Sequence, residues 1–193
     1  MNADIKKWLE KDGEPFLRKI NLKKGQSVLD FGCGEGHYTI PVAKIVGSKG
    51  KVYAFDKDKS VLSELEKTAR QFSLKNIELM HGDIKVSLED NFVDVVLCYD
   101  VVHYMRNRTP MYKEFYRLLK PKGLFSLYPK HRKNDYPLME LASISLETVI
   151  KEVEEFGFLL KEKLSLECLH DRYYNECIIL NFTLLKDADF LTG

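Results

Sequence analysis

The sequence predicts an α/β fold in which a doubly wound, seven-stranded sheet is mostly parallel and ends in a C-terminal antiparallel hairpin. From residue 28 to residue 157, short apolar runs alternate with stripes of helical period, which is typical of parallel strands joined by crossover helices. After residue 157 the alternation stops, and two strand-like runs follow each other without a helical stripe between them.

Five apolar runs bounded by turn residues are the predicted parallel strands. They cover Val28–Phe31, Lys51–Phe55, Asn76–Met80, Val93–Tyr99 and Gly123–Tyr128. The fourth run reads VDVVLCY and is the most apolar, so we expect that strand to be buried on both faces of the sheet.

Stripes of helical period lie between these strands. The predicted helices cover residues 39–46, 61–72, 109–119 and 146–156, and two short helices around 5–9 and 16–20 precede the first strand. Thr109 with Pro110 and Ser145 are start signals for the third and fourth of these helices, and Gly157 ends the fourth.

The two last strands are predicted at Phe158–Leu164 and Glu176–Leu185, with a polar stretch around Asp171–Asn175 between them. Two strands joined without a crossover helix pair in antiparallel fashion, so we expect a terminal hairpin.

The length of 193 residues suits one domain, and no linker or repeat divides it. We expect a helical cap over residues 1–25, a ligand-binding core over 26–130, and the last helix with the hairpin over 131–193. Thirty Lys and Arg residues against 29 Asp and Glu leave a net charge of +1. This balance excludes a dominant basic face, so nucleic acid is not an expected partner.

Composition also bears on the compartment and on metals. No apolar stretch approaches the roughly 20 residues of a membrane span, and the first residues contain no apolar signal core. The four cysteines form no CxxC pair and fit no zinc spacing, so we expect no metal site. These features predict a reduced, cytoplasmic protein.

A glycine-rich loop follows the first predicted strand in the run Asp30-Phe31-Gly32-Cys33-Gly34-Glu35-Gly36. Glycines let the backbone turn sharply and approach a ligand closely, and the helix behind the loop, near Tyr38, offers free N–H groups. Loops of this kind also occur for topological reasons, so the loop alone does not indicate a ligand.

The acidic residue at the end of the second strand sharpens the interpretation. Asp56 lies 20 residues after Gly36, where doubly wound folds place a carboxylate that binds ribose hydroxyls. The alternative is that Asp56 caps the next helix together with Asp58. A dinucleotide fingerprint needs a third glycine where His37 stands, so the G-x-G-x-G spacing disfavours NAD.

With these motifs the chain resembles the class I S-adenosylmethionine-dependent methyltransferases, whose first motif is an acidic residue followed by G-x-G-x-G. Three further stretches match that family's motifs in order: Gly82-Asp83-Ile84, Asp94 to Asp100, and Leu118 to Leu124. The resemblance spans residues 25 to 130 and implies a Rossmann-like fold with S-adenosylmethionine as cofactor and S-adenosylhomocysteine as product.

The resemblance implies roles for the glycine loop. The backbone at Gly32 and Gly34 would approach the methionine and ribose parts of the cofactor, and Asp30 would orient the amino group of the methionine through water. Cys33, Gly36 and Tyr38 belong to the same loop and helix start and are expected in the cofactor site.

The same resemblance assigns residues to the nucleoside. Asp56 would bind the ribose, Lys57 would lie beside the adenine, and Asp83 would accept a hydrogen bond from its exocyclic amine. Ile84 would cover the ring, and Tyr99 would contact the methionine end. Asp83 has the alternative role of capping a turn, and Ile84 that of ordinary core.

Methyl transfer needs a general base only if the acceptor atom carries a proton, because the cofactor's sulfonium already activates the methyl group. His103, which follows the fourth strand, is the candidate catalytic base, and His131 follows the fifth strand. The alternative for His103 is a structural residue packed under the next helix.

The acceptor is predicted by exclusion and resemblance to be a small molecule. The sequence after the fourth strand, Tyr99-Asp100-Val101, lacks the proline pair of enzymes that methylate nucleobase amines, and the cysteines do not suit arsenic methylation. The core is most similar to quinone methyltransferases. Aromatic and apolar residues outside the core that could cover an acceptor are Trp8, Phe16, Tyr128, Tyr136 and Met139.

Two other functions remain open at this point. The chain could bind S-adenosylmethionine without catalysis, as a partner subunit or sensor, or it could be a nicotinamide-dependent oxidoreductase. The intact glycine loop argues against a decayed cofactor site, and the glycine spacing and terminal hairpin argue against the oxidoreductase.

Overall fold

A computed structural model describes residues 2–131 and 139–186, so Tyr136 lies outside the described residues. Seven strands form one sheet in the order β3-β2-β1-β4-β5-β7-β6. The strands are β1 (Ser27–Phe31), β2 (Lys51–Asp56), β3 (Ile77–His81), β4 (Val93–Tyr99), β5 (Leu119–Tyr128), β6 (Phe158–His170) and β7 (Tyr173–Leu184). Strands β1 to β5 pair in parallel, and β7 pairs antiparallel with both β5 and β6. The predicted fold class is confirmed.

The strand order reverses between β1 and β4, which lie side by side although the chain passes through β2 and β3 between them. In such doubly wound sheets a crevice opens beyond the carboxyl ends of the strands at the reversal. The reversal therefore fixes where a ligand site can form, before any side chain is considered.

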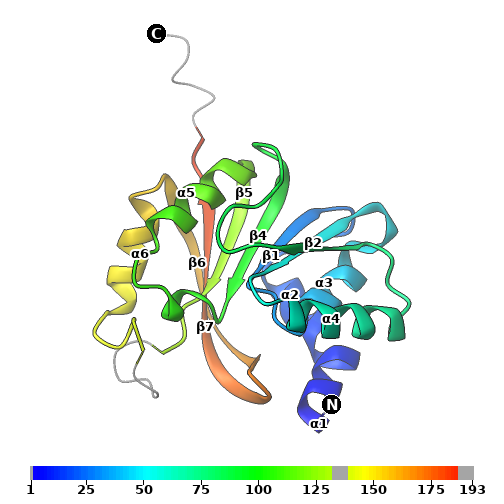
Figure 1. The fold of residues 1–193 in the computed structure, drawn as a ribbon. Coiled ribbons are helices and arrows are strands. Elements are labelled where there is room, and N and C mark those ends of the chain that lie inside the picture. Colours follow the sequence, from blue (N-terminus) through cyan, green and yellow to red (C-terminus); the bar gives the residue numbers. More distant parts are fainter. Residues whose placement is uncertain (1, 132–138, 187–193) are drawn as a thin grey trace.

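Helices cover both faces of the sheet (Figure 1). They are α1 (Ala3–Lys7), η1 (Trp8–Asp12, a π-helix), α2 (Gly13–Lys19), α3 (Thr39–Val46), α4 (Lys59–Gln71), α5 (Thr109–Leu118) and α6 (Leu146–Glu154), with short 3-10 turns η2 (Gly47–Lys49) and η3 (Val102–Tyr104). Side chains of the first four α-helices share one hydrophobic core, and those of α5 and α6 belong to a second core on the other face.

Alternate side chains along the central strands belong to these two cores. On β2, Val52 and Ala54 belong to the core beneath α3 and α4, while Tyr53 and Phe55 belong to the core beneath α5. Successive side chains of a strand point to opposite faces, so both faces of a central strand must be apolar here. This explains why the central strands read as continuous apolar runs.

The terminal hairpin is longer than predicted. β6 and β7 remain paired out to His170 and Tyr173, so only Asp171 and Arg172 form the turn, and the polar stretch is part of the strands. The outer part of β6 alternates exposed and half-buried residues, which weakens its apolar signal. The fifth strand also starts earlier than predicted, at Leu119.

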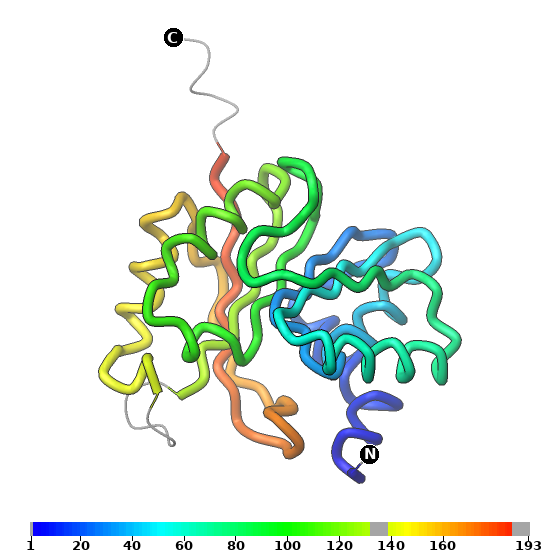
Figure 2. Tube along the Cα trace, viewed as in Figure 1, coloured from blue at the N-terminus to red at the C-terminus, as the bar shows by residue number. Residues whose placement is uncertain are grey.

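The far end of the hairpin lies against the N-terminal helices, as Figure 2 shows. The Asn2 side chain donates to the carbonyl of Arg172 at 2.7 Å, and the Tyr174 hydroxyl donates to Asp12 at 2.8 Å. These bonds hold the hairpin turn beside the carboxyl ends of the parallel strands, where it completes one wall of the site described below.

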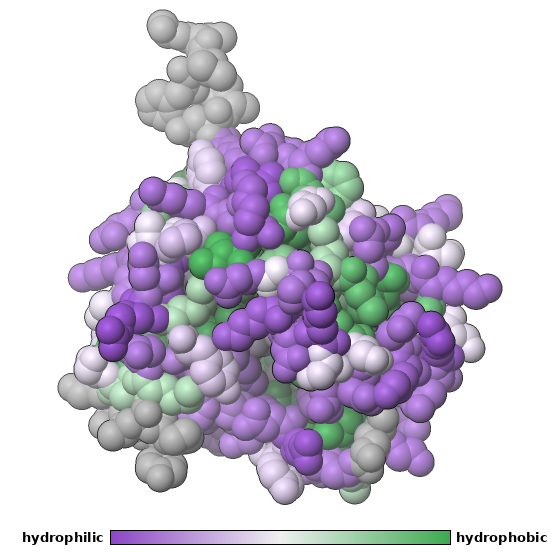
Figure 3. All heavy atoms as spheres, in the orientation of Figure 1, coloured by the Kyte–Doolittle hydropathy of each residue, from purple (hydrophilic) through white to green (hydrophobic). Residues whose placement is uncertain are grey.

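The face of the molecule in Figure 3 is mostly hydrophilic, with smaller hydrophobic patches between the hydrophilic residues. Among the described residues, no helix combines the length and the apolar character needed to cross a bilayer. All four cysteines lie within the described residues and are free and buried.

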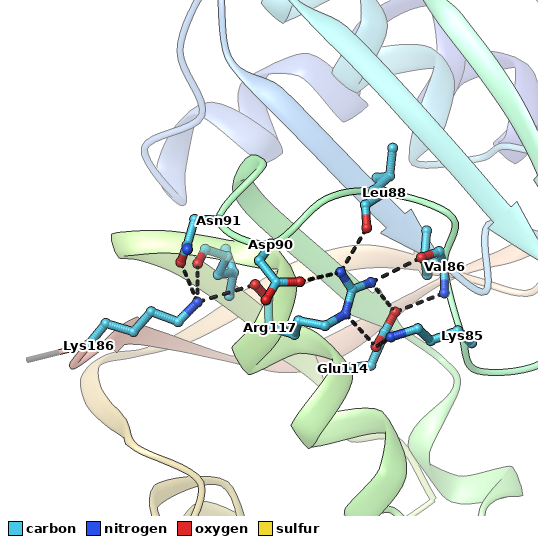
Figure 4. Close-up of polar contacts among 9 residues, drawn as sticks. Lys85, Val86, Leu88, Asp90, Asn91, Glu114, Arg117 and Lys186 are labelled. Carbon is cyan, nitrogen blue, oxygen red and sulfur yellow. Dashed lines mark hydrogen bonds and ion pairs between the residues drawn. The ribbon is translucent and has the colours of Figure 1, made fainter.

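An ion pair on α5, between the buried Glu114 and the partly exposed Arg117, anchors the segment between β3 and β4 (Figure 4). The Glu114 carboxylate accepts from Arg117 at 2.6 Å and from the Val86 N–H at 2.9 Å, and Arg117 donates to the carbonyls of Val86 and Leu88. Burial alone would raise the pKa of Glu114, but Arg117 and the N–H bond outweigh it and lower that pKa. Asp83 belongs to the segment held in this way and lies three residues before Val86.

Removing this carboxylate tests the anchor. Glu114→Gln should lower the free energy of unfolding by about 2–3 kcal/mol, because Arg117 loses its mostly buried partner. The pKa of Glu114 is lower in the folded state, so its contribution is present above the unfolded pKa and is lost as the pH falls. Urea unfolding should therefore show the deficit at neutral pH and a smaller one in acid. Glu66→Gln, at an exposed position of α4, is the control. A loss of unfolding free energy in Glu114→Gln no larger than that in Glu66→Gln would contradict the role of Glu114 as an anchor.

Candidate functional site

A cavity of about 870 Å³ opens at the carboxyl ends of β1, β2 and β4 and is closed on one side by the β6–β7 turn. It lies where the strand order reverses. Among the predicted site residues, those lining the cavity are Gly32, Cys33, Gly34, Tyr38, Asp56, Lys57, Asp83 and Tyr99. Asp30, Gly36, Ile84 and His103 do not line it.

Two glycines of the loop have different reasons to be glycine. Gly34 has φ +52°, and a Cβ built on it meets nothing within 4 Å, so its backbone borders open space in the cavity. Gly36 has φ +88°, and a Cβ there would lie 2.2 Å from Cδ1 of Leu65 on α4. Gly34 therefore leaves room for a ligand, whereas Gly36 lets the loop pack against a helix.

The Asp56 carboxylate organises the loop that faces it. It accepts hydrogen bonds from the Gly34 N–H at 2.9 Å and from the Asp58 N–H at 2.9 Å. A carboxylate has about four lone-pair sites, so two accepted bonds leave capacity for the hydroxyls of a ribose. The capping alternative is assigned to Asp58, whose side chain accepts from the Ser60 N–H at the start of α4.

Asp30 lies behind the loop and not on the cavity wall. Its side chain is buried and accepts a 2.5 Å hydrogen bond from the Thr39 hydroxyl at the start of α3. Burial raises the pKa of Asp30 to about 6, the Thr39 bond opposes this, and Asp56 adds to it. A role for Asp30 in a ligand contact therefore needs an intervening water, as the family resemblance already implied.

The other loop residues are held by packing. Cys33 is a buried thiol whose pKa is raised by burial, which keeps it neutral and excludes it as a thiolate. The Tyr38 hydroxyl donates to the carbonyl of Leu169 on the hairpin at 2.6 Å. Tyr38 thus joins the loop side of the cavity to the hairpin side.

The predicted adenine residues are only partly brought together. Asp83 and Lys57 line the cavity with exposed side chains, while Ile84 is half-buried outside the lining. The backbone carbonyl of Lys57 also lies within hydrogen-bond distance, 3.1 Å, of Nε2 of His81 on β3. The roles of Asp83, Ile84 and Lys57 toward an adenine stay predictions.

Tyr99 is fixed by a chain of hydrogen bonds across the sheet. Its hydroxyl lies 2.7 Å from Ser126 of β5, and Ser126 donates to Asn181 of β7 at 2.7 Å. Asn181 in turn donates to Glu162 of β6 at 3.2 Å. Because Ser126 uses its proton toward Asn181, Tyr99 is the donor to Ser126. The Tyr99 ring can therefore face the cavity in one orientation only.

The structure does not bring His103 to the cavity. The η3 turn directs its ring inward, where it is fully buried between Tyr104, at a ring-centroid distance of 4.2 Å, and His131 at 4.6 Å. This placement matches the structural alternative for His103. Trp8 and Phe16 likewise pack in the core and do not line the cavity.

Sequence reasoning missed a pair of residues that do line the cavity. His170, at the end of β6, lies with its Nδ1 2.8 Å from Oδ2 of Asp100, which directly follows β4. Asp100 could have been found because it follows a strand at the ligand edge of the sheet. His170 carried no local signal, since the predicted hairpin ended at Leu164 on this strand.

The charges around the cavity favour a cationic ligand. Among the residues that the structure describes, six carboxylate side chains line it, against the two permanent cations Lys57 and Arg172. The carboxylates are Glu35, Asp56, Asp58, Asp83, Asp100 and Asp171. A sulfonium with an attached ammonium group would be attracted by this field, and the open space at Gly34 gives it room.

The model of the "Methyltransferase domain" family matches residues 22–176. A demethylmenaquinone methyltransferase from Geobacillus is 32% identical over 111 residues, which are 57% of this chain and 47% of that protein. The chain spans about half the length of the curated relatives it matches.

Solved structures agree with this assignment. An S-adenosylmethionine-dependent methyltransferase from Aquifex aeolicus superposes with a TM-score of 0.78 at 25% identity, covering 93% of both chains. A putative methyltransferase from Bacillus halodurans shares the fold, with a TM-score of 0.74 at 18% identity over 91% of this chain and 99% of its own. The predicted family is thus confirmed, and the chain belongs to the S-adenosylmethionine-dependent methyltransferase domain family.

Proposed function

We propose that this protein transfers a methyl group from S-adenosylmethionine to a small-molecule acceptor. The observation that carries the proposal is the cavity at the strand reversal, where Gly34 leaves open space and Asp56 faces it with unused acceptor capacity. A non-catalytic S-adenosylmethionine-binding protein would need the same features, so turnover is what separates the two.

The residues present fit the cofactor in three respects. The open space at Gly34 admits a ligand against the backbone, Asp56 suits a ribose, and the acidic lining suits a positive charge. When bound, the cofactor supplies a methyl group already activated by a sulfonium leaving group. The protein's task is to orient the acceptor toward that methyl group and to exclude water, and such positioning can contribute about 7–11 kcal/mol to lowering a barrier.

The aromatic residues on the cavity lining favour a small, planar molecule as the methyl acceptor. Tyr104 and Tyr173 are exposed aromatic residues on its lining, next to Met105. Aromatic and apolar side chains around a few polar groups are typical of sites for small planar ligands. The demethylmenaquinone methyltransferases to which the chain is similar support a planar ring compound related to the quinones as acceptor. We further infer a cytoplasmic enzyme, which the four free cysteines support.

Calorimetry and labelled cofactor test this proposal. The full chain should bind S-adenosylmethionine and S-adenosylhomocysteine but not NAD, and Asp56→Ala should weaken binding by about 1.5–3 kcal/mol through loss of a charged hydrogen bond. Incubation with methyl-labelled S-adenosylmethionine and a small-molecule extract should yield a labelled small product. NAD binding with no response to the other two ligands would overturn the proposal, and ligand binding without any labelled product would favour the sensor.

A pair of glycine variants separates ligand contact from folding. Gly34→Ala should cost about 1–2 kcal/mol of stability, because alanine is strained at positive φ, and should lower S-adenosylhomocysteine affinity at least about tenfold by filling the open space. Gly36→Ala carries the same strain and in addition collides with Leu65, so it should lose more stability. Thermal unfolding and calorimetry of both variants check this. Unchanged affinity in Gly34→Ala would exclude a close ligand approach at that residue.

The raised pKa of Asp30 predicts a pH dependence of binding. Asp30 is half protonated near pH 6 in the free protein, and an ammonium group held nearby through water favours its ionised form. Binding should therefore release a proton at mildly acid pH, and affinity should fall about tenfold as the pH drops from 7 to 5. Calorimetry in buffers of different ionisation enthalpy measures the release. In Asp30→Asn the release should disappear, and a release that persists in that variant would refute the assignment.

A further inference from the structure

His170 and Asp100 form a hydrogen-bonded pair on the hairpin side of the cavity. The Nδ1 of His170 lies 2.8 Å from Asp100 Oδ2. An ionised carboxylate can only accept a hydrogen bond, so Nδ1 carries the imidazole proton and is the donor of this bond. The other nitrogen, Nε2, is 3.7 Å from Asp171 Oδ2, which is longer than a hydrogen bond. In the neutral imidazole, Nε2 therefore keeps a lone pair on a residue that lines the cavity.

The backbone at this pair is held in an uncommon conformation. Asp100 has φ +58°, in the left-handed region that non-glycine residues rarely adopt, and Asp171 beside His170 has φ +52°. Within the described residues, Oδ1 of Asp100 is buried without a hydrogen-bond partner. Strain and a buried polar atom cost stability, and such costs concentrate at functional sites.

Both residues are rigidly positioned. Asp100 follows central strand β4 directly, and the Tyr38 hydroxyl binds the carbonyl of Leu169, the residue before His170. The side chain of His170 is 11% exposed and that of Asp100 is 21% exposed, so the pair is mostly shielded and still reached from the cavity. A shielded, oriented imidazole with a carboxylate behind it is the arrangement that general-base catalysis uses.

Other charged and titratable groups also face His170. Asp171 adjoins it in the turn, Lys130 lies beyond the end of β5, and the His131 ring is 5.1 Å away. Burial favours the neutral imidazole, but the bond and charge of Asp100 outweigh burial and raise the pKa of His170 above its usual value. Burial also raises the pKa of Asp100, although His170 opposes this. A raised pKa strengthens the imidazole as a base near neutral pH.

We propose that His170, oriented by Asp100, is the catalytic base that removes a proton from the acceptor, and that the acceptor is therefore a hydroxyl compound of the phenol type. The proposal rests on the methyltransferase function proposed above. Tyr173, paired with His170 in the hairpin, and Tyr104, close enough to Asp100 and Asp171 to feel their charges, are exposed on the cavity lining and supply faces on which the ring of such an acceptor can stack.

The step balances without a further reactant. The acceptor oxygen forms a bond to the methyl carbon, and the carbon–sulfur bond breaks with its electron pair left on sulfur, which becomes neutral. The acceptor's proton moves to Nε2 of His170, and the imidazolium that forms is stabilised by the Asp100 carboxylate. Release of that proton to solvent through the cavity restores the neutral imidazole.

An indicator phenol tests the pair without turnover. 4-Nitrophenol is colourless when protonated and yellow as the phenolate, and it is titrated into the full chain saturated with S-adenosylhomocysteine at mildly acid pH. Bound probe should be yellow at a pH where free probe is mostly colourless, because the imidazolium form of His170 stabilises the phenolate beside it. In His170→Asn the phenolate fraction of bound probe should fall about tenfold, the effect of one pKa unit. Asp100→Asn should lower it in the same direction, and Glu66→Gln on α4 serves as the charge control.

A kinetic arm uses 1-naphthol as methyl acceptor. His170→Asn should lower kcat/KM at least about 100-fold, and the rise of rate with pH through the pKa of His170 should disappear. A purely structural role would lower the rate without changing the shape of that pH profile.

Each outcome bears on one proposal. Failure of S-adenosylhomocysteine to bind the wild-type chain would refute the proposed function. If it binds, two results with 4-nitrophenol would refute the base assignment: the yellow form survives in His170→Asn, or it is lost in Arg172→Gln. In the kinetic experiment, loss of the pH dependence in His103→Asn instead of His170→Asn would also refute it. Failure of 4-nitrophenol to bind the complex at millimolar concentration, or no methylation of 1-naphthol, would overturn the phenol-type acceptor.

Discussion

The hydrogen bond from the Gly34 N–H to Asp56 is the contact on which the site depends. It joins the loop after β1 to the end of β2, so the glycine loop is shaped by the same carboxylate that faces the cavity. The loop must take positive φ at Gly34 to present that N–H, and Gly36 must take it to pass over Leu65. This one hydrogen bond thus explains the spacing between the glycine loop and Asp56, the shape of the loop, and the placement of a carboxylate that can still accept hydrogen bonds from a ligand.

The sheet topology supplies the other half of the site. Reversal of strand order between β1 and β4 opens the crevice, and the β6–β7 hairpin, fastened by Tyr38 and by the N-terminal helices, closes it from the side. One wall is therefore built from local loop geometry and the other from a contact between residues far apart in sequence. The local wall suits a cofactor that many family members share, whereas the distant wall is free to differ between acceptors.

Much of the first wall could be predicted from sequence because its signals are local. The G-x-G-x-G run, Asp56 at a fixed distance and the apolar central strands each report their own structure, and seven strands with a terminal hairpin followed from the same periodicity. The second wall could not be predicted. The outer half of β6 pairs with β7 through exposed, alternating residues, so its strand signal is weak and the predicted strand ended at Leu164, before His170.

The histidines show why proximity along the chain misleads about catalysis. His103 follows β4 at the expected edge, but η3 turns it into the core, where its ring meets that of His131 edge to face. His131 in turn lies near His170. Only the last of these three rings reaches the cavity. A residue just after a strand can point either way, whereas Asp100, held at positive φ, has its carboxylate fixed toward the hairpin. Orientation by a partner across the sheet, and not position in the sequence, therefore decides which histidine can act on an acceptor.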